Sequence, residues 1–236
     1  MGQARRFGWL AIPLLMCIPV LWAGAQGTPP GGAAPAGQGA PAGGPPPGLV
    51  LKFAAPDAAR GQTLSRSCAG CHGPGGVSAQ ASVPGLAGQV PSYTRFQLSV
   101  FRAKLRPSAV MQGVASRLSD QDIADLAAYF AAGEPGPAWA ADPALRARGA
   151  ALFQGGDNDR NVIACAVCHG EDGRGADRQG IASVTNLAPE YGLEILHEFR
   201  DTPRFGVPHP DAMRIALKPL TDDDLKALAA YISSMK

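Results

Sequence analysis

The amino-acid sequence predicts an all-α protein made of two copies of one helical unit. Two observations support this prediction. The segment from Arg60 to Tyr129 recurs, with insertions, from Arg148 to Tyr231, which is a repeat of about one hundred residues. Each copy starts and ends with apolar residues at helical spacing, and neither shows the alternation of apolar and polar residues that is typical of strands.

Length and composition restrict what this chain can do. Its 236 residues allow one or two domains and exclude a large multidomain enzyme. The 21 basic and 19 acidic residues leave a net charge of +2. Nucleic-acid binding usually needs a strongly basic surface, so we expect no nucleic-acid partner.

The N-terminal 25 residues have the features of a signal peptide. Arg5 and Arg6 precede the uncharged segment 7–25, which ends in the small residues that a signal peptidase recognises. We therefore expect export of the chain and cleavage after Ala25. An uncleaved anchor is the alternative, because nineteen helical residues extend about 28 Å and a bilayer core is roughly 30 Å thick. In that case residues 7–25 would tether the protein to the membrane.

Residues 26–53 form a predicted linker. Positions 27–48 hold eight Gly, seven Pro and five Ala, and such a segment cannot bury enough apolar surface to fold. A tail without function is the competing interpretation. We expect the rest of the chain to form a first domain, a connector and a second domain, at residues 54–134, 135–141 and 142–236.

Both repeats carry the same signals for helix ends and helix packing. In the closing helices, Ser119 and Thr221 are predicted N-caps that form capping boxes with Asp122 and Asp224. Each of these helices has one apolar stripe, namely Ile123, Leu126, Ala127 and Phe130, and Leu225, Leu228, Ala229 and Ile232. In the opening helices, Gly61 and Gly149 remove a side chain where another helix could cross closely.

Two Cys-x-x-Cys-His motifs are the strongest chemical signal. They contain Cys68, Cys71 and His72 in the first repeat, and Cys165, Cys168 and His169 in the second. The spacing lets two thiols add to the two vinyl groups of one haem, while the histidine is presented to the iron. A four-Cys zinc site or a redox-active dithiol would not explain why His follows both pairs. We therefore expect two covalently bound haem c groups.

A methionine is the expected second axial ligand of each iron. Met111 and Met213 occupy equivalent positions about forty residues after each haem-binding histidine, just before the closing helix. The alternative interpretation is that both are core methionines. Among the other histidines, His209 is the one credible alternative ligand, and His197 is expected on the surface or in local hydrogen bonds.

These motifs resemble those of class I cytochrome c domains, and their tandem arrangement resembles the dihaem c4-type cytochromes. The resemblance covers about residues 54–236, and its most specific part is the segment 84–89 with the sequence Pro-Gly-Leu-Ala-Gly-Gln. It implies two helical domains, each wrapped around one covalent haem with His/Met ligation. It further implies an electron shuttle of a respiratory chain in the bacterial periplasm. The implied partners are membrane redox complexes, with a quinol-oxidising cytochrome bc-type donor and a terminal oxidase as acceptor.

The resemblance further implies a hydrogen bond that orients each haem histidine. In class I domains the carbonyl of the proline at position 84 accepts a hydrogen bond from the outer nitrogen of the haem histidine. Thr185 stands where the first repeat has Pro84 in our alignment of the two repeats, and the Gly-Gln pair is missing there. We therefore predict that the carbonyls of Pro84 and Thr185 accept these hydrogen bonds from His72 and His169.

The resulting functional prediction is a one-electron carrier without catalytic side chains. Methionine ligation leaves no iron position open for a substrate. One alternative is the electron-transfer subunit of a larger dehydrogenase or oxidase. A less favoured alternative is a dihaem enzyme of the peroxidase or thiosulfate dehydrogenase type, because every cysteine after the signal segment is already used.

Overall fold

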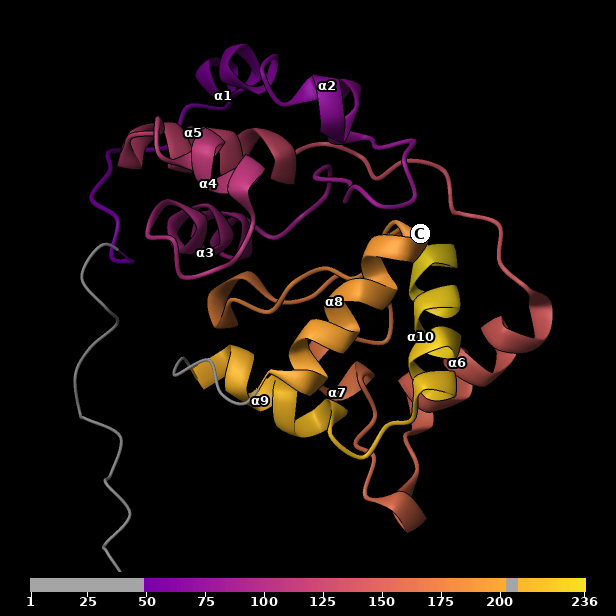
Figure 1. Cartoon of the computed structure of the whole chain (residues 1–236). Helices are drawn as coiled ribbons and strands as arrows, with labels where there is room; N and C mark the ends of the chain where they lie inside the picture. Colours follow the sequence, from indigo (N-terminus) through magenta and orange to yellow (C-terminus); the bar gives the residue numbers. More distant parts are fainter. Residues whose placement is uncertain (1–48, 203–207) are drawn as a thin grey trace, which may run out of the picture. The chain divides into compact units, whose positions relative to one another are not determined.

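A computed structural model describes residues 49–202 and 208–236, and these residues form helices joined by loops (Figure 1). The first repeat contains α1 (Ala58–Ser65), α2 (Ala69–His72), η1 (Pro74–Gly76), α3 (Pro91–Arg102), α4 (Ala109–Ala115) and α5 (Asp120–Ala131). The second contains α6 (Pro143–Gly155), η2 (Asn158–Arg160), α7 (Ala166–His169), η3 (Asp177–Gln179), α8 (Pro189–Asp201), α9 (Pro208–Leu217) and α10 (Asp222–Ser234). The described residues include two isolated β-bridges and no strand. The all-α prediction is confirmed.

The N-terminal predictions fall on residues outside the described part. The predicted signal peptide or anchor lies there, and so does the linker up to position 48. Within residues 49–202 and 208–236, no helix has the length and apolar character needed to span a bilayer.

In each repeat the opening helix packs on the closing helix, as α1 does on α5 and α6 on α10 (Figure 1). The two helix crossings are close enough to require glycine. A Cβ on Gly61 would lie 2.1 Å from the carbonyl oxygen of Asp125, and one on Gly149 would lie 2.0 Å from that of Ala227. The predicted role of these two glycines is confirmed.

The predicted caps of the closing helices are also present. The Ser119 hydroxyl accepts a hydrogen bond from the Asp122 backbone N–H at 3.1 Å, and the Asp122 carboxylate accepts one from the Ser119 N–H at 2.9 Å. Thr221 and Asp224 form the same pair of bonds at 3.2 and 3.0 Å. Each box satisfies N–H groups that the first helical turn leaves unpaired, so it sets where α5 and α10 begin.

The apolar stripes of α5 and α10 form the centre of each core. Every stripe residue predicted from the sequence is buried. Around α10 the core also contains Leu152, Phe153, Val162, Leu196, Leu217 and Leu220. The second repeat therefore buries one apolar cluster, and Cys165 and Ala166 of the Cys-x-x-Cys-His turn pack against its edge.

Candidate haem-binding sites

Each Cys-x-x-Cys-His motif forms a single helical turn. Cys68 precedes α2 and His72 ends it, while Cys165 and His169 have the same places at α7. A glycine with positive φ, +79° at Gly73 and +81° at Gly170, terminates each turn. Residues at i, i+3 and i+4 share one face of a helix. Two thiols and one imidazole are therefore presented together.

The first thiol of each pair does not have the electrostatic environment of a redox-active cysteine. Burial raises the pKa of Cys68, and burial raises the pKa of Cys165 to about 11. Redox-active and nucleophilic cysteines have lowered pKa values, because the thiolate is the reactive species. The second cysteine of each pair is exposed. This arrangement suits a thioether to a bound group better than a thiol-disulfide cycle.

The zinc alternative also fails on geometry. Among residues 49–202 and 208–236, no three His, Cys, Asp or Glu side chains gather in a way that could hold a metal ion. A structural zinc site needs four such ligands around one point. The two cysteine pairs therefore do not form one shared metal site in the described part of the chain.

Both histidines are oriented by a backbone carbonyl. His72 Nδ1 lies 2.8 Å from the Pro84 carbonyl oxygen, and His169 Nδ1 lies 2.9 Å from the Ala182 carbonyl oxygen. A carbonyl can only accept, so Nδ1 carries the proton and the lone pair of Nε2 is left for a metal. Burial, partly opposed by the bond to Ala182, lowers the pKa of His169 and favours the neutral form that ligates iron.

The prediction that Thr185 supplies the carbonyl for the second haem histidine is wrong. The carbonyl that His169 contacts belongs to Ala182, three residues before Thr185, whose hydroxyl instead lies 3.0 Å from that of Ser183. The prediction aligned Thr185 with Pro84 and therefore placed the segment 184–187 beside His169. The backbone hydrogen bonds give a different alignment. The Gly173 carbonyl accepts from the Val184 N–H, just as the Gly76 carbonyl accepts from the N–H of residues 86 and 87. The segment 182–184 therefore corresponds to the segment of the first repeat that begins at Pro84.

The two methionines lie on equivalent helices. Met111 is in the first turn of α4, where its backbone N–H donates to the hydroxyl of the N-cap Ser108 at 3.3 Å. Met213 is in α9, half-buried against the core of the second repeat. Their assignment as axial ligands stays a prediction.

The remaining histidines have different positions. His197 accepts a hydrogen bond from Arg200 at 3.1 Å and lies 3.6 Å from the Asp201 carboxylate, so the prediction of local hydrogen bonding is confirmed. His209 belongs to α9, but its side chain is outside the described part of the structure.

The donors that each repeat offers fit a c-type haem. Two thiols and one imidazole with a free Nε2 lie on one turn, and a thioether is available from a second helix. Thioether bonds to the porphyrin and His/Met ligation of the iron use these groups and no others.

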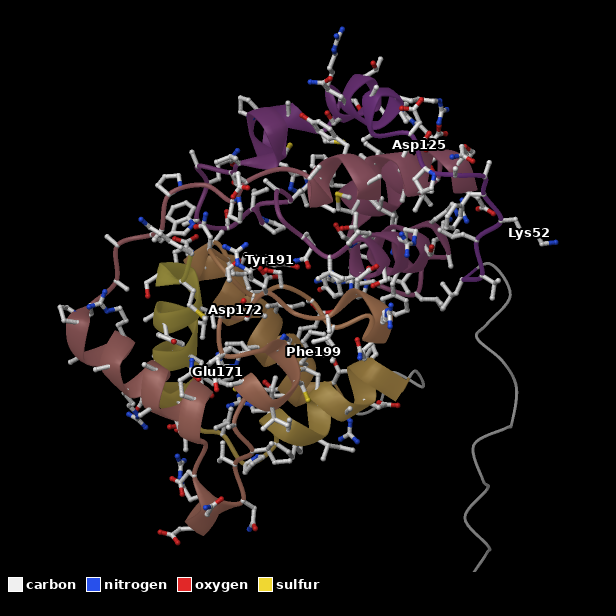
Figure 2. All side chains as sticks on the ribbon, turned by 180° about the vertical axis from the view of Figure 1, so that it is seen from behind. Lys52, Asp125, Glu171, Asp172, Tyr191 and Phe199 are labelled. Carbon is white, nitrogen blue, oxygen red and sulfur yellow. The ribbon has the colours of Figure 1, made fainter. Side chains whose placement is uncertain are left out.

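Several residues at the contact between the repeats were not assigned a role from the sequence. Arg106 donates to Gln97 at 2.6 Å within the first repeat, and to Tyr191 and Glu198 of the second at 3.2 and 3.3 Å. Tyr191, labelled in Figure 2, lies on α8. Tyr93 and Tyr191 occupy equivalent positions in the two repeats, but this similarity gives no indication that an arginine lies between the repeats.

Comparison with known proteins agrees with this geometry. The sequence model of the family "Cytochrome c" matches residues 58–133 and 146–236. The chain is 34% identical over 194 residues to cytochrome c4 of Azotobacter vinelandii, covering 78% of this chain and 92% of that protein. It is 33% identical over 173 residues to a thiosulfate dehydrogenase electron acceptor of Stutzerimonas stutzeri, covering 72% and 79%.

A solved structure gives the same result. The crystal structure of reduced recombinant cytochrome c4 from Pseudomonas stutzeri superimposes with a TM-score of 0.71 at 34% identity, covering 77% of this chain and all of the other. Proteins of this type transfer electrons and are not enzymes, so the dihaem-enzyme alternative is set aside. The chain belongs to the cytochrome c family and, within it, to the c4-type cytochromes, which carry two haem c groups and transfer electrons.

Proposed function

We propose that this dihaem carrier works in the bacterial periplasm and passes single electrons between membrane redox complexes. Its donor would be a quinol-oxidising complex of the cytochrome bc type, and its acceptor a terminal oxidase. The predicted signal segment supports export. Fractionation of the native host tests the location: recovery in the cytoplasmic fraction would contradict it.

We propose His72 with Met111 and His169 with Met213 as the axial ligand pairs, and Cys68, Cys71, Cys165 and Cys168 as the thioether attachments. The observation that carries this assignment is the shared histidine geometry. Both rings donate Nδ1–H to a carbonyl at 2.8 and 2.9 Å, which leaves the lone pair of Nε2 free for a metal. When bound, each haem iron supplies reversible one-electron exchange, and methionine ligation raises its potential.

The chain contributes orientation and exclusion of other ligands. The carbonyl bond holds each imidazole in one tautomer and one rotational position, so little rearrangement accompanies a change of iron charge. The half-buried methionines Met111 and Met213 would close the remaining axial position. Closed irons exchange electrons without binding substrate, which suits a carrier.

An optical redox titration with a haem count tests the core of the proposal. We expect two haems per chain and two one-electron transitions. Met111→Ala and Met213→Ala serve as matched variants. Each should remove about half of the sulfur-to-iron absorption of the oxidised protein, because each takes away one of two equivalent ligands. An undiminished band in either variant would contradict that ligand assignment.

A second candidate function is electron acceptance from a thiosulfate dehydrogenase. The observation that favours it is the 33% identity to proteins described as thiosulfate dehydrogenase electron acceptors. Stopped-flow mixing of the oxidised protein with a thiosulfate dehydrogenase and thiosulfate would distinguish the two. Rapid reduction that saturates with protein concentration supports this donor. Reduction only by the quinol-oxidising complex supports the first proposal.

A further inference from the structure

One peptide group connects the two repeats to the second histidine. The group between Ala182 and Ser183 has its carbonyl bonded to His169 Nδ1 at 2.9 Å. The N–H of the same group donates to the side-chain oxygen of Gln89 at 2.8 Å. Gln89 belongs to the first repeat and lies 94 positions earlier in the chain. A residue of one repeat therefore contacts the group that orients the histidine of the other.

Gln89 is held in this position by further bonds. Its side-chain nitrogen donates to the Ser183 carbonyl at 2.9 Å, so the amide makes two bonds to one residue. Its oxygen also accepts from the backbone N–H of Val90, at 2.8 Å, where α3 begins. Ser183 is itself only 6% exposed. The contact is consequently shielded from water, which strengthens hydrogen bonds between the groups that remain.

The contact is not reciprocal. The segment of the second repeat that corresponds to 88–90 is 186–188, which contains Asn186 and no glutamine. The Asn186 amide donates to the Gly136 carbonyl in the connector at 2.7 Å. The influence of Gln89 should therefore fall on the second haem and spare the first.

We propose that Gln89 is a positioning residue of the second haem site and lowers its reduction potential. Accepting the Ser183 N–H polarises the peptide group and makes the Ala182 carbonyl a stronger acceptor. A stronger acceptor draws the His169 Nδ1 proton and makes the ring a more basic ligand, which favours the oxidised iron. This inference rests on the proposed function, because it takes His169 as an axial ligand.

Potentiometric titration of the holoprotein with Gln89→Leu tests the inference. Leucine keeps the volume but accepts no hydrogen bond. We expect the equilibrium constant for one-electron reduction of the second haem to increase about threefold, which raises its potential by about 28 mV. The potential of the first haem should stay unchanged. The Met213→His variant assigns the two transitions, because the transition whose potential it shifts belongs to the second haem.

Gln89→Glu and Ser92→Ala make the test specific. Glutamate keeps the acceptor and strengthens it with charge, so the second potential should fall. If the substitutions only loosened the contact between the repeats, the potential of the second haem would shift in the same direction in both Gln89 variants. The Ser92 hydroxyl donates to Asp177 across the repeats at 2.8 Å without touching the Ala182 peptide. We expect its loss to leave both potentials unchanged.

The outcomes separate this inference from the function on which it depends. An unchanged second potential in Gln89→Leu, or equal shifts of both haems, would overturn the role of Gln89. Failure of the ligand assignment would appear in the unaltered protein, as the absence of His/Met absorption from one of the two haems.

Discussion

Asp224 is a buried carboxylate whose surroundings are arranged to keep it ionised. It is fully buried, and it accepts hydrogen bonds from Arg148 and Arg160, both at 2.7 Å, and from Thr221 at 2.8 and 3.0 Å. Burial alone opposes ionisation, but the bonds from Arg160, Thr221 and Arg148 outweigh it and lower the pKa of Asp224. A paired and hydrogen-bonded charge can be retained in a protein interior.

Asp224→Asn should destabilise the protein by about 2–3 kcal/mol, because it leaves two guanidinium groups beside a neutral amide and weakens the capping box. The exposed fractions of Arg148 and Arg160, 49% and 38%, keep the loss below that of a fully buried pair. Unfolding of the holoprotein by guanidinium chloride measures this loss of stability. Asp223→Asn, at an exposed position paired with Lys226, is the control and should cost less than about 0.5 kcal/mol. Equal losses in both variants would contradict the role of burial.

Acid should remove the stabilisation that Asp224 provides. Its pKa in the folded protein is lowered below the unfolded value of about 3.9, so its contribution is present above about pH 4 and disappears as pH falls through the folded value. The free-energy difference between the original protein and Asp224→Asn should therefore be constant from pH 7 to 5 and shrink below pH 4. A difference that stays constant down to pH 2.5 would show that folding does not lower the pKa of this carboxyl group.

Residue-scale predictions succeeded where the chemistry lies within a few neighbouring positions. The Cys-x-x-Cys-His turns and the capping partners depend on local spacing, so their arrangement could be inferred from the sequence. The carbonyl that orients His169 could not, because any residue has a carbonyl. Its identity depends on the path of a loop, and the alignment of the two repeats that placed Thr185 opposite Pro84 had the wrong register.

Helix packing depends on two glycines that have no room for a side chain. Gly149→Ala should destabilise the protein by about 3 kcal/mol or more, because its Cβ would overlap the backbone carbonyl of Ala227 and α6 would have to move away from α10. Gly155→Ala lies in the same helix with no atom within 4 Å of the new methyl group. It should be neutral or stabilising by up to about 1 kcal/mol.

Thermal unfolding of the two glycine variants, followed by circular dichroism, measures the difference. A similar midpoint for both would mean that α6 and α10 can separate slightly without loss of core contacts. The close crossing was predictable from the sequence. Glycine is unfavourable inside a helix, so its presence at the same place in both repeats indicates that another helix passes close by. The short helices η2 and η3 were not expected, because each follows from a loop whose ends are joined by an isolated bridge.

At the scale of the molecule, the contacts between the repeats are polar and specific. Besides Gln89, the bonds include those from Ser92 to Asp177 and from Glu190 and Tyr191 to the Ala81 carbonyl. Tandem motifs predicted two similar units, but they gave no information about which backbone groups pair between them. Such pairs involve positions more than 80 residues apart, and only the folded chain brings them together.

The two repeats differ in charge, and this difference should appear in the kinetics of reduction. Residues 49–141 hold eight basic and five acidic groups, and residues 142–236 hold eleven and fourteen, so the parts carry +3 and −3 before the haem propionates are counted. Charged reagents are attracted to the surface of opposite sign at low ionic strength. An anionic reductant should therefore reduce the first haem faster, and a cationic one the second.

Stopped-flow reduction with one reagent of each sign checks this expectation, using the potential of each haem to correct for driving force. The preference should weaken between 10 and 500 mM salt, because the screening length falls from about 30 Å to a few ångströms. Identical haem preferences for both reagents at low salt would contradict the idea, since scattered charges cancel at the distance of approach. A preference that persists at high salt would point to access to the haem edge as its cause.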